Sequence, residues 1–260
     1  MEDIFSIELG FWEWILFAVV GVLTGVINTL AGSGSLITLP IFIFLCGLPP
    51  TVANGTNRIG ALIQSGAGVL TYKQTGKFET KGVAWLVVPS ILGAIVGALI
   101  ATDLNEKVMN YTIGGLMVFM LIVLLLNPKR WIRETEAEVS RNKHPMTIMG
   151  FFLIGIYGGF IQAGIGIFLL AAMVLGARYS LVASNGIKLL IVFIFNIPTL
   201  FIFFYYNQVH VGLGLTMAVF QAIGAVLGVK TISKLPNANV WIHRLLIVIV
   251  IASAIKFFVK

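Results

Sequence analysis

Two basic side chains inside apolar segments are the clearest candidates for chemistry in this chain of 260 residues. Arg58 and Lys188 each lie within a stretch that is otherwise long and apolar. The sequence has no Asp or Glu between Glu13 and Glu79, and none after Glu138. A charge at membrane depth costs at least about 3 kcal/mol on insertion scales, and it normally faces a partner or a wet cavity. Because the chain supplies no nearby carboxylate, we expect a substrate anion to neutralise these cations.

Other polar residues share helix faces with the two cations. Asn54, Asn57 and Arg58 fall at i, i+3 and i+4, which places them on one face of a helix. In the second half of the chain, Asn185 and Lys188 are three residues apart. Both faces offer amide and cationic donors for an oxyanion. The alternative is that the asparagines only bond across helices and that the cations snorkel or cap carbonyl groups.

Two glycine-rich breaks interrupt the apolar runs at corresponding places in the two halves. The residues concerned are Asn28, Gly32, Ser33 and Gly34 in the first break, and Gln162, Gly164 and Gly166 at the second. Non-helical backbone survives in hydrocarbon only where protein or a wet cavity surrounds it, and paired breaks point to a transporter's substrate site. Free N–H groups at helix starts attract anions. We expect both breaks to bind the anion, although small residues also serve helix packing alone.

The elements that must position these residues are apolar segments typical of membrane-spanning helices. The chain is 58% hydrophobic and 10% charged, whereas a soluble domain has about 25% charged residues. We predict an all-α, polytopic membrane protein with about ten transmembrane segments, two of them short and beside the glycine breaks. The predicted segments are 11–30, 35–47, 50–72, 82–102, 108–126, 146–163, 167–176, 181–206, 211–231 and 240–259. The two short segments, 35–47 and 167–176, either cross the membrane or are re-entrant.

An internal repeat relates the two halves. With a shift of 131 positions, Asn54 falls on Asn185 and Gly93 falls on Gly224. Gly93 and Gly97 are spaced for close packing between helices. Each half has five predicted segments, and an odd number makes the second half enter from the opposite side. The sequence therefore predicts two inverted five-segment repeats.

The distribution of Lys and Arg predicts the orientation in the membrane. We expect an N-terminal repeat at 1–126, a cytoplasmic linker at 127–145 and a C-terminal repeat at 146–260. With both termini outside, most basic residues lie in inner loops, as the positive-inside rule requires. The outer side then holds Lys107, Lys256 and Lys260.

Composition also excludes several classes of function. The formal charge of +7 belongs to loops that set topology, so it does not indicate nucleic-acid binding. Cys46 is the only cysteine, and we expect no disulfide, metal site or cofactor. His144, His210 and His243 lie in loops or at segment ends. Because no His, Asp or Glu lies at membrane depth to form a catalytic pair, we expect no enzymatic activity.

Five stretches carry a family resemblance. They are Asn28 to Pro40, Ala53 to Arg58, Tyr72 to Phe78, Gly159 to Gly166 and Ser184 to Lys188. In content and order they resemble the TauE/SafE family of sulfite and organosulfonate exporters, also called toluene sulfonate uptake permeases. The resemblance covers nearly the whole chain. It implies a secondary carrier in the cell membrane for sulfur-containing anions such as sulfite, sulfoacetate or other sulfonates.

We therefore predict a multi-pass carrier that exports a small sulfur-containing oxyanion by alternating access. The alternatives are an anion channel and a carrier of non-sulfur organic anions. No embedded carboxylate is available to carry a coupled proton, so coupling would use Lys188, ionisation of the substrate or the membrane potential. The expected partners are the small anion and the lipid bilayer. The exact substrate, the direction of transport, the coupling ion and a homo-oligomeric state are left open by the sequence.

Overall fold

A computed structural model describes residues 9–74, 78, 83–126, 144–230 and 238–258, and all regular structure within those ranges is helical. The helices of the first half are α1 (Phe11–Ala31), α2 (Ser35–Phe44), α3 (Pro50–Gln74), α4 (Ala84–Thr102) and α5 (Glu106–Leu125). Those of the second half are α6 (Pro145–Phe160), α7 (Ile165–Ala171) with its continuation η3 (Ala172–Gly176), α8 (Leu181–Tyr205), α9 (Val211–Lys230) and α10 (Ala238–Phe258). Each predicted segment coincides with one of these helices to within a few residues.

Local signals explain several helix ends. Asn105 and Ser180 cap α5 and α8, because their side-chain oxygens accept hydrogen bonds from the N–H groups of Val108 and Ala183. Gly32 ends α1 in the left-handed conformation, with φ 74° and ψ 23°. Glycine adopts this conformation without steric cost and is the usual residue at such an end. The sequence therefore stops α1 directly before the first break.

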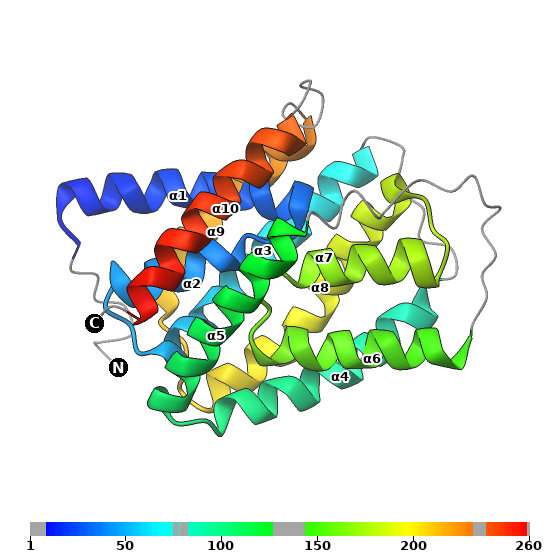
Figure 1. Ribbon diagram of the computed structural model, residues 1–260, viewed down its shortest axis with the longest axis horizontal. Coiled ribbons are helices and arrows are strands. Elements are labelled where there is room, and N and C mark those ends of the chain that lie inside the picture. Colours follow the sequence, from blue (N-terminus) through cyan, green and yellow to red (C-terminus); the bar gives the residue numbers. More distant parts are fainter. Residues whose placement is uncertain (1–8, 75–77, 79–82, 127–143, 231–237, 259–260) are drawn as a thin grey trace.

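The helices of the two halves pack against each other in corresponding pairs. α1 contacts α9, and α6 lies along α4, as Figure 1 shows for the second pair, so the first helix of each half contacts the fourth helix of the other. The third helices, α3 and α8, contact each other, and so do the fifth helices, α5 and α10. Exchanging the two halves leaves this set of pairs unchanged. The packing is therefore of the kind that a two-fold relation between the halves would produce.

Glycines permit the close approach of these helices. A Cβ atom added to Gly93 or Gly97 of α4 would collide with the carbonyl oxygen of Phe152 or Ile156 in α6. In the corresponding pair, a Cβ atom on Gly224 of α9 would collide with a carbonyl oxygen of α1. The predicted packing role of Gly93 and Gly97 is thus confirmed.

Several helices have the length and composition that a membrane span needs. Five qualify among the described residues, namely α1, α4, α5, α8 and α9. The shorter apolar helices are α2, α6 and the α7–η3 segment. These findings support a multi-pass membrane protein. Ten complete crossings, the inverted direction of the second half and external termini stay predictions, and most of the linker predicted at 127–145 lies outside the described residues.

Candidate functional site

The two glycine breaks touch each other. The N–H of Gly166 donates a hydrogen bond to the carbonyl oxygen of Gly32, with N and O 3.0 Å apart. A Cβ atom on either glycine would collide with the backbone of the other. Segments that are far apart in the sequence therefore meet main chain to main chain, at a point where only glycine fits.

The second break lies near Gln162 to Gly166, as the sequence predicts, but it begins inside the predicted segment 146–163. α6 and α7 are separated by residues 161–164, and Gly166 lies in the first turn of α7. Gln162 and Gly164 have φ values of 67° and 72°. Left-handed backbone is uncommon for a residue such as glutamine, so hydropathy alone placed Gln162 inside the preceding segment. The predicted segment 146–163 therefore extends three residues past the end of α6 at Phe160.

A small cavity lies where the breaks meet. It is lined by Asn28, Gly32, Ser35, Gln162, Ile165, Gly166, Lys188, Leu189 and Val192. These residues come from both halves of the chain, through α1, α2, the second break with α7, and α8. The cavity volume is about 10 Å³, close to the least that one water molecule requires. The site is therefore closed in this structure to any solute larger than water.

Lys188 brings a positive charge to the cavity from α8. Its side chain is 1% exposed. Its ammonium group donates to the carbonyl oxygen of Thr29 at 3.0 Å and to Oδ1 of Asn185 at 3.2 Å. Thr29 lies in the last turn of α1, where the helix dipole is negative. Lys188 thus covers the carboxyl end of α1 and also forms part of the cavity wall.

Arg58 makes a corresponding contact with the end of α6. It is completely buried, and its guanidinium group donates to the carbonyl oxygens of Gly158 at 2.5 Å and Gly159 at 2.8 Å. It also donates to Oε1 of Gln162 at 3.1 Å, and its Cζ lies 5.1 Å from the ring centre of Phe203. Arg58 is not part of the cavity lining, so in this structure it reaches the cavity only through Gln162.

These partners change the explanation for the two buried cations. The sequence suggested that a substrate anion neutralises them, whereas the structure gives both cations hydrogen bonds to carbonyl oxygens at helix ends. The acidic residues that the structure describes, Glu13, Asp103 and Glu106, are all exposed. Because cations cover the negative ends of α1 and α6, the positive ends of α2 and α7 are left to set the potential where the breaks meet.

Asn54 and Asn57 bond to residues beside the breaks and do not line the cavity. Asn54 donates to the carbonyl oxygen of Phe160, the last residue of α6, at 2.7 Å. Asn57 accepts a hydrogen bond from Thr38 at 2.6 Å and donates to Oγ of Ser35 at 3.2 Å. The alternative that such asparagines bond across helices is therefore what the structure shows for these two residues.

The remaining predicted residues lie next to the lining or within it. Asn28 belongs to the lining, and its Oδ1 accepts a hydrogen bond from the N–H of Gly34 at 3.3 Å. Ser33 donates to the carbonyl oxygen of Ala31 at 3.4 Å. Ser33, Gly34, Gly164 and Asn185 are absent from the lining. The structure thus brings Asn28, Gly32, Gln162, Gly166 and Lys188 together around one cavity.

Gln64 is a buried residue of this region that the sequence did not single out. Its Oε1 accepts a hydrogen bond from Nδ2 of Asn28, and its Nε2 donates to Oγ1 of Thr29 at 3.1 Å. It lies on α3 seven positions after Asn57, a spacing that returns to the same helix face. That spacing was the signal that could have found it. Gln64 supports the end of α1, which Lys188 also contacts.

Comparisons with known proteins agree with this arrangement of helices. The sequence profile of the family described as "Sulfite exporter TauE/SafE" matches residues 17–257. Similar proteins include "Probable membrane transporter protein ORF9" from Sinorhizobium, 27% identical over 96% of this chain and 94% of the relative. A "Probable membrane transporter protein" from Haemophilus influenzae is 24% identical over 84% of each chain. In Escherichia coli K12, "Probable membrane transporter protein YfcA" is 24% identical over 82% of this chain and 78% of the relative.

No solved structure matches this chain. The family match nevertheless covers nearly all of the sequence, including both breaks, both buried cations and every helix of the site. The relatives are matched over most of their own length and carry the names of membrane transporters. The chain therefore belongs to the TauE/SafE sulfite exporter family and is a membrane transporter.

Proposed function

We propose that this transporter exports a small sulfur-containing oxyanion, such as sulfite or an organosulfonate, through the place where the two glycine breaks meet. The observation that carries the proposal is the cavity itself, in which the breaks of both halves and the ammonium group of Lys188 come together. Its polar lining, Asn28, Ser35, Gln162 and Lys188, offers hydrogen-bond donors. The family description supports sulfite-type anions as the substrate class.

The charge distribution favours an anion over a cation at this point. In carriers with broken helices, the starts of half-helices bind anionic groups, and unwound carbonyl groups bind coupling cations. Here the carbonyl oxygens of Thr29, Gly158 and Gly159 already accept hydrogen bonds from fixed cationic side chains. The starts of α2 and α7 adjoin the cavity at Ser35 and Ile165. An anion entering the cavity would meet positive potential from both starts and from Lys188.

Alternating access supplies the movement that the closed cavity requires. Sulfite has three oxygens around sulfur and is larger than a water molecule, so it does not fit a volume of about 10 Å³. Opening requires the main chains to separate at the contact between Gly32 and Gly166. Each glycine belongs to a different half, so rocking one half against the other would break this contact and admit the anion.

The proposal is tested by anion flux into proteoliposomes that contain the purified protein. Lys188→Met removes the charge from the cavity wall, and Lys188→Arg retains a positive charge there. A hydrogen bond to a charged group is worth about 1.5–3 kcal/mol, so we expect Lys188→Met to lower the apparent affinity for sulfite by about 10- to 100-fold. Lys230→Met is the matched control, because Lys230 is an exposed residue in the last turn of α9. Equal flux in Lys188→Met and the wild type would reject the site.

The same assay separates the two alternatives. A carrier saturates and is accelerated by anion on the far side of the membrane, whereas a channel conducts without saturation or counter-flow. Competition of unlabelled sulfite, sulfoacetate and carboxylates against labelled sulfite distinguishes sulfur-containing anions from other organic anions. Stronger competition by a carboxylate than by every sulfur-containing anion would replace the proposed substrate class.

A further inference from the structure

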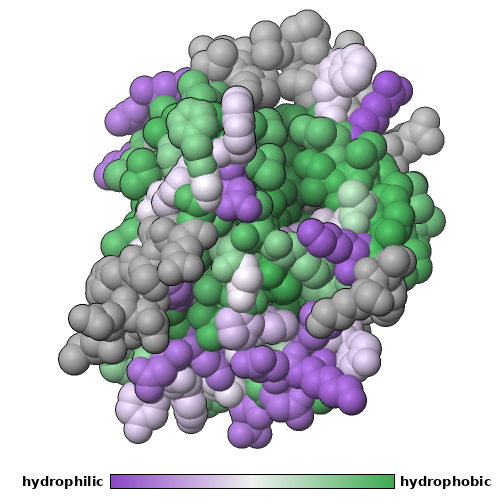
Figure 2. All heavy atoms as spheres, turned by 90° about the vertical axis from the view of Figure 1, so that its left-hand side faces the viewer, coloured by the Kyte–Doolittle hydropathy of each residue, from purple (hydrophilic) through white to green (hydrophobic). Residues whose placement is uncertain are grey.

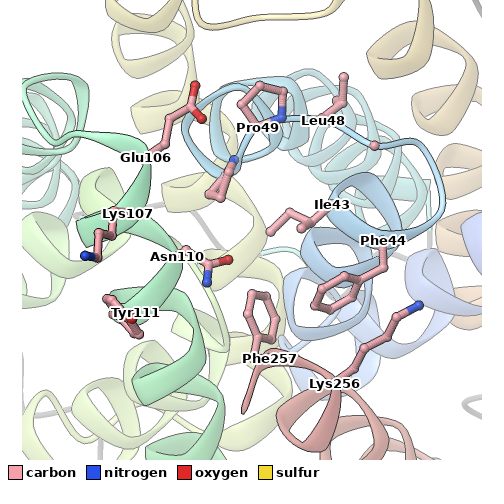
Figure 3. Close-up of a pocket in the computed structure, with 12 residues that line it drawn as sticks. Ile43, Phe44, Leu48, Pro49, Glu106, Lys107, Asn110, Tyr111, Lys256 and Phe257 are labelled. Carbon is pink, nitrogen blue, oxygen red and sulfur yellow. The ribbon is translucent and has the colours of Figure 1, made fainter. Parts of the chain in front are cut away.

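A second, much larger cavity lies at the ends of four helices. It has a volume of about 690 Å³ and lies between the end of α2, the start of α3, the first turns of α5 and the last turn of α10 (Figure 3). This volume is in the range of small-molecule sites, about 300–1,000 Å³. It shares no lining residue with the cavity at the glycine breaks. It is therefore a separate cavity from the one at the breaks.

One part of this large cavity is apolar and aromatic. Ile43 and Phe44 of α2, Leu48 of the following turn and Phe257 of α10 belong to its lining. The rings of Phe44 and Phe257 meet edge to face, with their centres 4.7 Å apart. These side chains offer an apolar surface of the kind that holds a hydrocarbon chain.

The rim of the large cavity is polar and mainly basic. Lys107 and Lys256 lie on opposite sides of it, and the Asn110 side chain lies between them (Figure 3). Nζ of Lys256 lies 4.8 Å from the ring centre of Phe44. Both lysines are exposed, so their flexible side chains can move onto an anion between them. Glu106 is the one acidic residue of the lining, which leaves the rim with a net positive charge.

Apolar helix surfaces lead away from the large cavity along α5 and α10, which pack side by side. On α5, Ile122 is 53% exposed and Leu125 is 62% exposed, and on α10, Val248 is 63% exposed and Ile255 is 57% exposed. In a membrane these surfaces contact acyl chains. Figure 2 shows this end of the molecule, where apolar side chains lie beside polar side chains that gather most densely along its lower edge. The large cavity is thus placed where lipid-facing helix surfaces end and polar residues begin.

We propose that the large cavity binds an anionic phospholipid. The phosphate lies between Lys107 and Lys256 with the Asn110 amide as a further donor, and one acyl chain begins on Phe44 and Phe257. Lysines beside a membrane attract the head groups of anionic lipids, and with both termini outside, as predicted, Lys107 and Lys256 would meet those of the outer leaflet. Tyr111, 62% exposed at the rim, is a residue typical of the membrane–water interface. The lipid holds α10 against α2 and α5 from outside the transport site.

The test is lipid binding to the purified full-length protein, measured by native mass spectrometry with phosphatidylglycerol and phosphatidylcholine. We expect phosphatidylglycerol to bind more tightly. The double variant K107Q/K256Q should weaken its binding by about 30-fold, since each basic residue near a membrane surface contributes about 1 kcal/mol. K230Q removes a lysine from the last turn of α9, outside the large cavity, and should leave the affinity unchanged.

A variant that is expected to bind the lipid more tightly provides a test that misfolding cannot mimic. Glu106→Gln removes the negative charge from the rim, so it should tighten phosphatidylglycerol binding by about fivefold. Glycerol 3-phosphate, which has the phosphate but no acyl chains, separates a lipid from a free anion and should bind at least 100-fold more weakly. Three results would overturn the proposal: unchanged phosphatidylglycerol binding in K107Q/K256Q, equal binding of phosphatidylcholine, or binding of glycerol 3-phosphate as tight as that of the lipid.

Discussion

Four glycine-to-alanine substitutions separate two features of the glycine breaks, the left-handed backbone and the main-chain contact. Gly32 has a left-handed φ of 74°, and its position also touches the backbone of Gly166. Gly166 makes the contact without a left-handed φ. Gly47 has a left-handed φ of 66° with no atom within 4 Å of an added Cβ. Gly115 of α5 has neither a left-handed φ nor an atom within 4 Å of an added Cβ. Each alanine variant therefore carries a different combination of strain and collision.

The expected magnitudes follow from these four environments. A left-handed backbone costs a residue other than glycine about 1–2 kcal/mol, and an added methyl group in a packed region costs about 1–3 kcal/mol. We expect Gly47→Ala to lose about 1–2 kcal/mol of unfolding free energy and Gly32→Ala to lose about 2–5 kcal/mol. Gly166→Ala should lose less than Gly32→Ala, because alanine favours the helix by up to about 1 kcal/mol. Gly115→Ala should leave the unfolding free energy unchanged or raise it by up to about 1 kcal/mol.

Reversible unfolding of the purified variants in mixed micelles measures these differences, and sulfite flux in proteoliposomes measures their effect on transport. Gly32→Ala and Gly166→Ala should both reduce flux, whereas Gly115→Ala should leave it unchanged. If Gly32→Ala were no less stable than Gly47→Ala, the collision with Gly166 would contribute nothing, and the main-chain contact between the breaks would be refuted.

Three further predictions concern the residues around the breaks. Arg58→Met should lower the unfolding free energy by about 2–4 kcal/mol, because it removes the donor to the buried carbonyl groups of Gly158 and Gly159 in α6. An unfolding free energy equal to that of the wild type would show that these hydrogen bonds are dispensable. Gln64→Leu should lower the unfolding free energy by about 1–3 kcal/mol and reduce sulfite flux, since it removes the side chain that bonds to Asn28 and Thr29. Ser65→Ala, at the next position of α3, is the control. An equal loss of unfolding free energy in both variants would contradict a specific role of Gln64. Replacement of sodium by choline should not change sulfite flux. The carbonyl groups at helix ends that bind sodium in other carriers with broken helices here accept hydrogen bonds from Lys188 and Arg58. A flux that requires sodium would show a coupling site elsewhere.

Hydropathy was sufficient to predict the helices and the first break. Long apolar runs gave segments that coincide with the helices, and Gly32 provided a recognisable end for α1. The end of α6 was set too late, at 163, because the first left-handed residue after this helix is Gln162, not a glycine. Apolar neighbours such as Ile161 and Ala163 give no sign of a helix end. A break made by such residues depends on the packing of the rest of the chain.

The burial of Arg58 and Lys188 was also predictable, but their partners were not. A sequence shows which side chains carry charge, whereas it does not show which main-chain carbonyl groups will lie beside them. In this fold α3 of one half lies against the end of α6 in the other, and α8 lies against the end of α1. The absence of nearby carboxylates therefore had a second explanation, in which helix ends take the place of an acidic partner.

A structure determined with a bound heavier analogue of sulfite, such as selenite, tests the proposed transport site most directly. We predict selenium between the starts of α2 and α7, with a selenite oxygen within hydrogen-bonding distance of the Lys188 ammonium group and the hydrogen bond from Gly166 to Gly32 broken. Selenite found only at other positions, with the two glycines still in contact and Lys188 bonded to Thr29 as it is here, would contradict transport through the breaks.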